Sequence, residues 1–329
     1  MRRARLLSRM LLLSLLVVGA SAPSAQARGK RVREFPIPTV GGWPEGITAG
    51  PDGNLWFTEF LGDKIGRIAP TGAITEFPIP TAESLPWGIA TGSDRNLWFT
   101  EAAANNIGRI TAQGAITEFA VPTGGSGPLQ IAAGPDGNLW FTELYGNNIG
   151  RITPKGAFAE FPVPTSNAFP EGIGAGPDGN LWFTEYSADN IGRITTQGAI
   201  TTFPLPRRGR GPVGIAAGPD GNLWFAEIAG NGIGRITTEG VVTEYLIPTH
   251  QSQPVGIAPG PDRNLWFTES YGNKIGRITT EGAITEFLIP TAESNPLLIA
   301  AGPDRNLWFA EGKGNNIGVI HPSTAGPRV

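Results

Sequence analysis

The chain has 329 residues, of which 40% are hydrophobic and 16% charged, and it carries a formal charge of −3 with no cysteine. The absence of cysteine excludes disulfide bonds, thiolate metal sites, cysteine nucleophiles and a lipid-modified N-terminal cysteine. The acidic balance argues against a surface that binds nucleic acid or an anionic membrane.

Residues 1–27 have the pattern of a secretory signal peptide. Four arginines precede an apolar stretch from about Met10 to Ala20, and they are Arg2, Arg3, Arg5 and Arg9. This stretch is too short to span a membrane. Ala25-Gln26-Ala27 fits an A-x-A cleavage site. Removing those arginines leaves 21 basic against 28 acidic residues, a formal charge of −7. We therefore expect a secreted or periplasmic monomer with a single domain, residues 28–329, that is not inserted into the membrane after cleavage.

The remaining chain repeats every 42 residues around a tryptophan in the phrase N-L-W-F-[TA]-E. These tryptophans are Trp56, Trp98, Trp140, Trp182, Trp224, Trp266 and Trp308. In the first unit, residues 46–49, 54–59, 64–68 and 73–79 have the composition of short strands, separated by turns rich in Gly, Pro and Asp. Four strands in a unit of this length are typical of one blade of a β-propeller. The sequence predicts an all-β, seven-bladed propeller.

The two ends of the repeat array predict how the ring closes. An outermost strand, marked by an aromatic residue such as Phe77, follows the first six tryptophans but not Trp308. The missing strand is found at the N-terminus, where Phe35 lies 42 residues before Phe77. We expect this N-terminal strand to complete the last blade and leave no open sheet edge between the first and last repeats.

Two series of charged residues recur with the repeat. A hairpin of the second and third strands would set Trp56 near Arg67 and Phe57 near Gly66, so the repeated arginines are expected to stack on the indoles as part of the scaffold. Val319 alone interrupts that series. A glutamate also ends each second strand, which predicts seven carboxylates at one mouth of the propeller. Their favoured interpretation is local hydrogen bonding or pairing, such as Glu59 with Lys64, and the alternative is a cation site. The glutamates are Glu59, Glu101, Glu143, Glu185, Glu227, Glu269 and Glu311.

Function is expected where the repeats differ, just before and at the start of the innermost strands. The candidate ligand-binding residues there are Trp43, Glu45, Trp87, Gln130, Phe169, Glu171, His250 and Gln253. Glu45 and Glu171 are three blades apart, nearly opposite each other in a seven-fold ring. Aromatic walls with carboxylates and amides suit a small molecule, a peptide or a glycan, although the aromatic residues could instead plug the channel. Three arginines, Arg207, Arg208 and Arg210, crowd the loop that enters the fifth blade.

The repeated phrases G-P-[DS]-[GR]-N-L-W-F-T-E, N-[NK]-I-G-R-I and T-E-F-P-I-P resemble those of the streptogramin B lyases, also called virginiamycin B lyases, over essentially the whole chain after residue 27. More loosely, they are similar to NHL repeats. The resemblance implies an elimination that opens a cyclic depsipeptide lactone, with Mg²⁺ steadying the negative charge. It also implies a histidine base after a proline in a Glu-Pro-His-Gly phrase of the last blade, a second Pro-His, and a glutamate that ends the next strand.

The chain departs from this pattern at the base. The counterpart of Glu-Pro-His is Asn295-Pro296-Leu297, and only Glu311 matches a family site residue. The two histidines, His250 and His321, fall in a loop and in the tail. No residue after the corresponding proline is histidine; these residues are Glu45, Trp87, Leu129, Glu171, Val213, Val255 and Leu297.

Two functions remain open from the sequence. The favoured one is an exported ligand-binding or scaffold protein for a peptide, glycan or cell-wall fragment, with no certain cofactor. The alternative is a Mg²⁺-dependent C–O lyase of the streptogramin B type in which Glu45 or Glu171 replaces the histidine as base, with Glu311 as a weak candidate for catalysis or metal binding.

Overall fold

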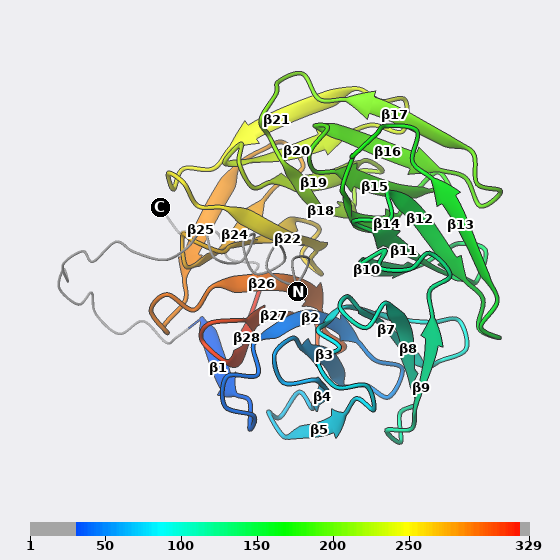
Figure 1. The fold of residues 1–329 in the computed structure, drawn as a ribbon. Helices are drawn as coiled ribbons and strands as arrows, with labels where there is room; N and C mark the ends of the chain where they lie inside the picture. The colour runs from blue at the N-terminus through cyan, green and yellow to red at the C-terminus, as the bar shows by residue number, and fades with distance from the viewer. Residues whose placement is uncertain (1–30, 323–329) are drawn as a thin grey trace. The chain divides into compact units, whose positions relative to one another are not determined.

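The computed structural model describes residues 31–322, and the proposed signal peptide lies outside that range. Seven separate four-stranded antiparallel sheets form the blades of a closed ring (Figure 1). Each innermost strand contacts those of the blades on either side, and β2 contacts β26 across the junction of the chain ends. The predicted seven-bladed propeller is therefore confirmed. Residues 31–322 include no helix with the length and apolarity needed to cross a membrane.

The blades share one order of strands from the axis outward. The innermost strands are β2(Pro44–Ala49), β6(Pro86–Thr91), β10(Pro128–Ala133), β14(Pro170–Ala175), β18(Pro212–Ala217), β22(Pro254–Pro259) and β26(Pro296–Ala301). The second strands are β3(Leu55–Glu59), β7(Leu97–Glu101), β11(Leu139–Glu143), β15(Leu181–Glu185), β19(Leu223–Glu227), β23(Leu265–Glu269) and β27(Leu307–Glu311). The third strands are β4(Lys64–Ile68), β8(Asn106–Ile110), β12(Asn148–Ile152), β16(Asn190–Ile194), β20(Gly232–Ile236), β24(Lys274–Ile278) and β28(Asn316–Ile320). The outer strands are β1(Val32–Pro36), β5(Ile74–Pro78), β9(Ile116–Ala120), β13(Phe158–Pro162), β17(Ile200–Pro204), β21(Val242–Leu246) and β25(Ile284–Leu288).

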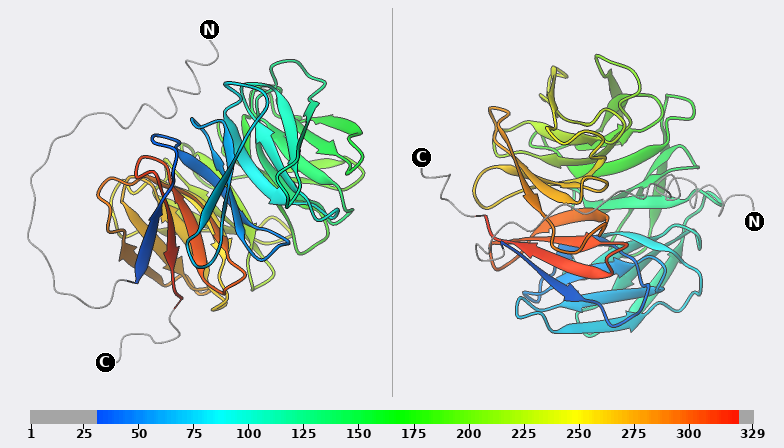
Figure 2. Two further views of the ribbon diagram at one scale, coloured as in Figure 1. Left: turned by 90° about the horizontal axis from the view of Figure 1, so that it is seen from below. Right: turned by 90° about the vertical axis from the view of Figure 1, so that its left-hand side faces the viewer.

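Ring closure follows the predicted register. The strand β1 pairs antiparallel with β28, with Phe35 opposite Ile317, so the last sheet has the order β1-β28-β27-β26. Figure 2 shows β1, dark blue, lying beside the red C-terminal strand. Beyond the strand, the Ile37 amide donates to the Asn315 carbonyl at 3.1 Å, and the Thr291 amide donates to Glu34 Oε1 at 2.8 Å. Side chains and backbone of both chain ends thus hold the junction.

Each blade has the same layered core. Trp56 lies opposite Arg67 and Phe57 opposite Gly66, as predicted. The Trp56 indole is fully buried, stacks on Phe77 at 5.5 Å and lies under the Arg67 guanidinium at 5.5 Å. A side chain at Gly66 would collide with the Phe57 ring, which explains the repeated glycine.

The last blade compensates for the missing arginine. Val319 is opposite Arg33 of β1, and the Arg33 guanidinium lies 5.0 Å from the Phe35 ring, which in turn stacks on Trp308. The N-terminal strand therefore supplies both the aromatic ring and the cation that the seventh repeat lacks.

Threonine hydroxyls join neighbouring innermost strands around the channel. Thr58 Oγ1 accepts the Gly46 amide at 2.8 Å and donates to the Trp87 carbonyl of the next blade at 2.7 Å. Equivalent bridges from Thr100, Thr142, Thr184 and Thr268 repeat this link. These bonds fix the backbone of the residue that follows the proline in each innermost strand. That residue differs between blades, so its backbone position is held whichever side chain it carries.

Candidate functional site

The mouth of the channel is built from loops that end in an unusual backbone conformation. The residue before each innermost-strand proline has a positive φ, such as 54° at Trp43 and 51° at Phe169. Its carbonyl accepts the amide of the residue that follows the repeated glutamate, as in Phe60 to Trp43 at 3.0 Å and Tyr186 to Phe169 at 3.2 Å. Asn315 of the seventh blade adds a bond from the Trp43 amide to its Oδ1, at 3.3 Å. The loop ends are therefore held by backbone contacts whatever side chain they carry.

The predicted aromatic and amide residues lie half-buried at these loop ends or at the start of the innermost strands. Trp87 meets Phe60 edge-on with ring centroids 5.3 Å apart, and Phe169 meets Tyr145 edge-on at 6.4 Å. Phe60, Tyr145 and Tyr186 were not among the sequence candidates. The sequence feature that could have identified them is the variation, between blades, of the one or two residues that follow each repeated glutamate. Gln130 and Gln253 share the half-buried environment of the aromatic candidates.

Glu45 and Glu171 interact across the channel. They lie on the innermost strands β2 and β14, three blades apart, and the charge of Glu171 acts on Glu45. Burial, and then the charge of Glu171, raises the pKa of Glu45 to about 8, while the Trp43 indole opposes this shift. Burial raises the pKa of Glu171 to about 8 as well. One oxygen of each carboxyl, Oε2, is buried without a hydrogen-bond partner.

The position that the family resemblance assigns to a histidine base holds a packed leucine. Leu297 is 8% exposed. A methyl group built on Gly312 would come within 2.8 Å of Leu297 Cδ1 and 2.7 Å of Trp43 Nε1, so both side chains press against that glycine. Asn295 uses its amide nitrogen to donate to Ser270 Oγ at 2.5 Å. The site is therefore filled by apolar contacts and offers no proton acceptor at Leu297.

The repeated glutamates are enclosed in the blades, which differs from the expectation that they decorate the mouth. All seven are at most 1% exposed. Glu59 lies behind Glu76 of the outer strand. The Glu76 carboxylate accepts hydrogen bonds from the Thr39 amide, the Thr39 hydroxyl and Lys64 Nζ, at 2.7–2.9 Å. The expected Glu59–Lys64 pair is thus replaced by Lys64–Glu76 at 2.7 Å. Burial, followed by the charge of Glu76, raises the pKa of Glu59 to about 8.

Six blades contain such a pair of glutamates, and the fourth has Thr202 at the outer position. Where the third strand begins with asparagine, its amide bonds the buried carboxyl, as Asn148 does to Glu143 at 3.2 Å. Glu311 follows this pattern: Asn316 donates to it at 3.4 Å, and burial, then the Glu34 charge, raises its pKa to about 8. Its surroundings match those of Glu101 and Glu143, which also lie beside an asparagine and an outer glutamate.

These shifts predict that the fold loses stability as the solution becomes alkaline. A carboxyl whose pKa is higher in the folded than in the unfolded state stabilises fully below the unfolded value of 4.5, and that contribution is lost as pH rises through the folded value of 7–8. The melting temperature should therefore be lower at pH 9 than at pH 6. Glu143→Gln should change stability modestly at pH 6 and reduce the difference between the two pH values, since an amide does not ionise. Glu239→Gln, at a fully exposed glutamate, is the control. An unchanged pH difference in Glu143→Gln would contradict the assignment.

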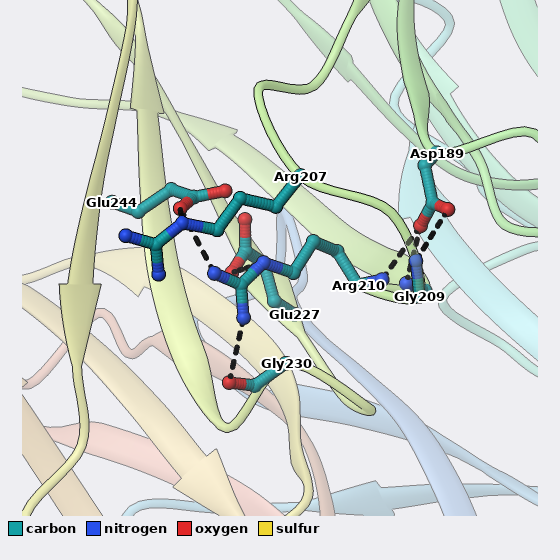
Figure 3. A network of polar contacts seen from close by, with 8 residues as sticks. Asp189, Arg207, Gly209, Arg210, Glu227, Gly230 and Glu244 are labelled. Atoms are coloured by element: carbon teal, nitrogen blue, oxygen red, sulfur yellow. Dashed lines mark hydrogen bonds and ion pairs between the residues drawn. The ribbon is translucent and has the colours of Figure 1, made fainter.

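The arginines of the loop into the fifth blade form a separate cluster (Figure 3). Arg210 Nη2 lies 3.0 Å from Glu244, and its Nε lies 3.7 Å from Glu227. The Arg210 side chain packs against Gly230, where a Cβ would come within 2.8 Å of Arg210 Cδ, and Arg210 Nη1 donates to the Gly230 carbonyl at 3.3 Å. Arg207 is 68% exposed and lies 3.6 Å from Glu244, at the edge of a cavity of about 370 Å³. Arg210 therefore interacts with both glutamates of its blade and opposes the rise in the pKa of Glu227 that burial and Glu244 cause.

The residues that would correspond to a Mg²⁺ site do not form a ligand set. Leu297 has no donor atom, the Asn295 amide nitrogen is bonded to Ser270, and Glu311 is enclosed beside Glu34. Within residues 31–322, no cluster of three or more His, Cys, Asp or Glu side chains is placed to hold a metal. His250 and His321 are exposed.

Comparisons with known proteins agree on one family. The profile of the Virginiamycin B lyase family matches residues 25–123, 89–254 and 231–326. The chain is 43% identical to the crystal structure of virginiamycin B lyase from Staphylococcus aureus, covering 89% of this chain and 99% of that one with a TM-score of 0.85. It is 42% identical to a catalytically inactive histidine-to-alanine variant of that lyase with quinupristin, over 89% and 99% of the two chains and with a TM-score of 0.85. A 51-residue segment is 49% identical to virginiamycin B lyase from Saccharopolyspora erythraea, spanning 16% of this chain and 17% of that protein.

Proposed function

Since this chain belongs to the virginiamycin B lyase family, we propose that it is an exported member that binds a peptide, glycan or cell-wall fragment at the channel mouth without the histidine chemistry of the family. The repeated framework supports binding at the mouth, since the loop ends that carry the variable residues are fixed by backbone bonds. The proposal includes a secreted or periplasmic monomer.

The observation that carries this proposal is Leu297. A general base must accept a proton within hydrogen-bond reach of the substrate, and neither Leu297 nor the packed Trp43 beside it offers a basic atom. A histidine-to-alanine change leaves the Staphylococcus aureus lyase catalytically inactive. We apply the same expectation to this chain, in which the family resemblance places Leu297 where a histidine base is implied.

A second candidate function is favoured by the carboxyls of the channel. A pKa of about 8 makes Glu45 and Glu171 stronger bases than ordinary glutamates, as a carboxylate acting in place of histidine would need to be. In this alternative, the protein is a C–O lyase that removes the proton α to a carbonyl with one of these carboxylates. The two functions share the mouth and differ in whether a linear product forms.

Binding is tested by titrating residues 28–329 with quinupristin and following heat and tryptophan fluorescence. We expect saturable binding that weakens about tenfold or more in Trp43→Ala and Trp87→Ala, because each variant removes a large apolar contact area. Val40→Ala changes a side chain that is 97% exposed and serves as the control. Absence of binding, or equal binding by all four proteins, would contradict a ligand site at the mouth.

A further inference from the structure

We propose that Glu45 and Glu171 form a receptor for one alkylammonium group, which a ligand inserts into the channel from the mouth. This inference rests on the proposed binding function and specifies the charge that the ligand carries. It concerns residues that the repeat does not share, because the equivalent positions in the other five blades are Trp, Leu or Val.

Each of the two carboxyls supplies an acceptor atom that has no hydrogen-bond partner among residues 31–322. Glu45 is 1% exposed, and its Oε2 has no hydrogen-bond partner, as is true of Glu171 Oε2. The groups that act on the Glu45 carboxyl are the Glu171 charge and the Trp43 indole, and neither is positive. A buried carboxyl oxygen without a partner is costly, and an ammonium group carries three N–H donors, enough to serve one acceptor atom of each carboxyl.

Aromatic rings near the two carboxyls favour an organic cation. Trp43 is two residues before Glu45 and interacts with its carboxyl. Burial, and then the charge of Glu171, raises the pKa of the Tyr186 hydroxyl. The Phe60 and Trp87 rings meet edge-on at the neighbouring loop end. Aromatic faces attract organic cations and cover their alkyl carbons.

A divalent metal ion is the less suitable occupant. Ca²⁺ and Mg²⁺ take six or more oxygen ligands, and neither Glu45 nor Glu171 lies in a cluster of three metal-binding side chains within the described part of the chain.

Ligand binding should be coupled to proton release. Burial raises the pKa of both Glu45 and Glu171 to about 8, with the charge of Glu171 adding to the shift of Glu45, so both carboxyls are largely protonated at neutral pH. Besides each other, the two carboxyls interact with the Trp43 indole and the Tyr186 phenol. The charge of Asp189 also acts on the Tyr186 phenol. An ammonium group favours the carboxylate form, so the proton of a carboxylic acid is released to the buffer as the cation enters. Affinity should then weaken about tenfold per pH unit below 8 for each carboxyl that must ionise.

The test uses n-butylammonium chloride as the probe and residues 28–329 as the protein. Indole N–H signals in NMR follow binding at Trp43 and Trp87, while the seven repeated indoles donate to aspartates in the blades and serve as internal references. We expect shifts confined to the mouth tryptophans, weaker binding of about tenfold or more in Glu45→Gln and in Glu171→Gln, and stronger binding at pH 8.5 than at pH 6.5. Glu281→Gln, at an exposed glutamate, should bind as the unmodified protein does.

Several outcomes would overturn the proposal. These are equal shifts with neutral 1-butanol, unchanged affinity in both glutamine variants, an affinity independent of pH, or saturation by MgCl₂ alone at the same signals. Melting curves confirm that each variant is folded, and the pH series on the unmodified protein needs no substitution. If quinupristin binds but n-butylammonium does not, the ammonium receptor fails while the proposed binding function stands.

Discussion

A protein that begins at residue 40 is expected to lose the closed ring. Its last sheet would lack β1, so β28 would present an unpaired edge to solvent, which favours aggregation. The deletion also removes Phe35 from its stack on Trp308, the buried Ile37 side chain and the bond from Thr291 to Glu34. We expect insoluble protein or a melting temperature lower by well over 10 °C, because several buried contacts and a whole strand are lost at once.

The matched control is a protein that begins at residue 28 and retains β1. A second variant, Ile37→Ala, removes one buried side chain and should cost about 2–4 kcal/mol of unfolding free energy. Thermal melting followed by circular dichroism compares the three proteins. Equal melting temperatures for the proteins that begin at residues 40 and 28 would show that the N-terminal strand does not hold the ring closed.

Restoring the family phrase is expected to be necessary for histidine-dependent turnover. Asn295→Glu with Leu297→His returns the acid and the base, and a positioned general base contributes about 10²- to 10⁴-fold in rate. The structure also explains why this double substitution is not expected to suffice, since the Trp43 indole and Leu297 press together against Gly312. Histidine at position 297 must therefore share space that is already filled.

Product formation from a type B streptogramin, followed by mass spectrometry with and without Mg²⁺, measures this effect. Leu129→His is the control, because Leu129 occupies the same place in the third blade and is similarly buried. Adding Trp43→Ala to the double variant tests the steric argument, and we expect it to raise turnover further. Equal rates in the double variant and in Leu129→His would show that the place in the ring does not matter.

The sequence predicted the architecture because the repeat determines it. A 42-residue period with one aromatic phrase per unit specifies the blades, and the offset of Phe35 specifies closure, both of which the structure confirms. The opposite positions of Glu45 and Glu171 followed from counting blades.

Interactions that depend on side-chain direction could not be read from the period. The repeated glutamates turn into the blades because Thr39 and Lys64 bind the second carboxylate, Glu76, and leave Glu59 enclosed behind it. The position of Arg210 depends on Gly230 of a different loop, since a side chain at Gly230 would collide with Arg210 Cδ. Both cases pair residues from different elements, and no local pattern records them.

The most direct test of the central claim is a Mg²⁺-dependent assay of linear product from a type B streptogramin with unmodified residues 28–329. Our account predicts binding with no linearisation above background, with or without Mg²⁺, because the buried Leu297 stands where the family resemblance implies the histidine base. Robust turnover that Glu45→Gln or Glu171→Gln abolishes would contradict it and assign the base to a channel carboxylate.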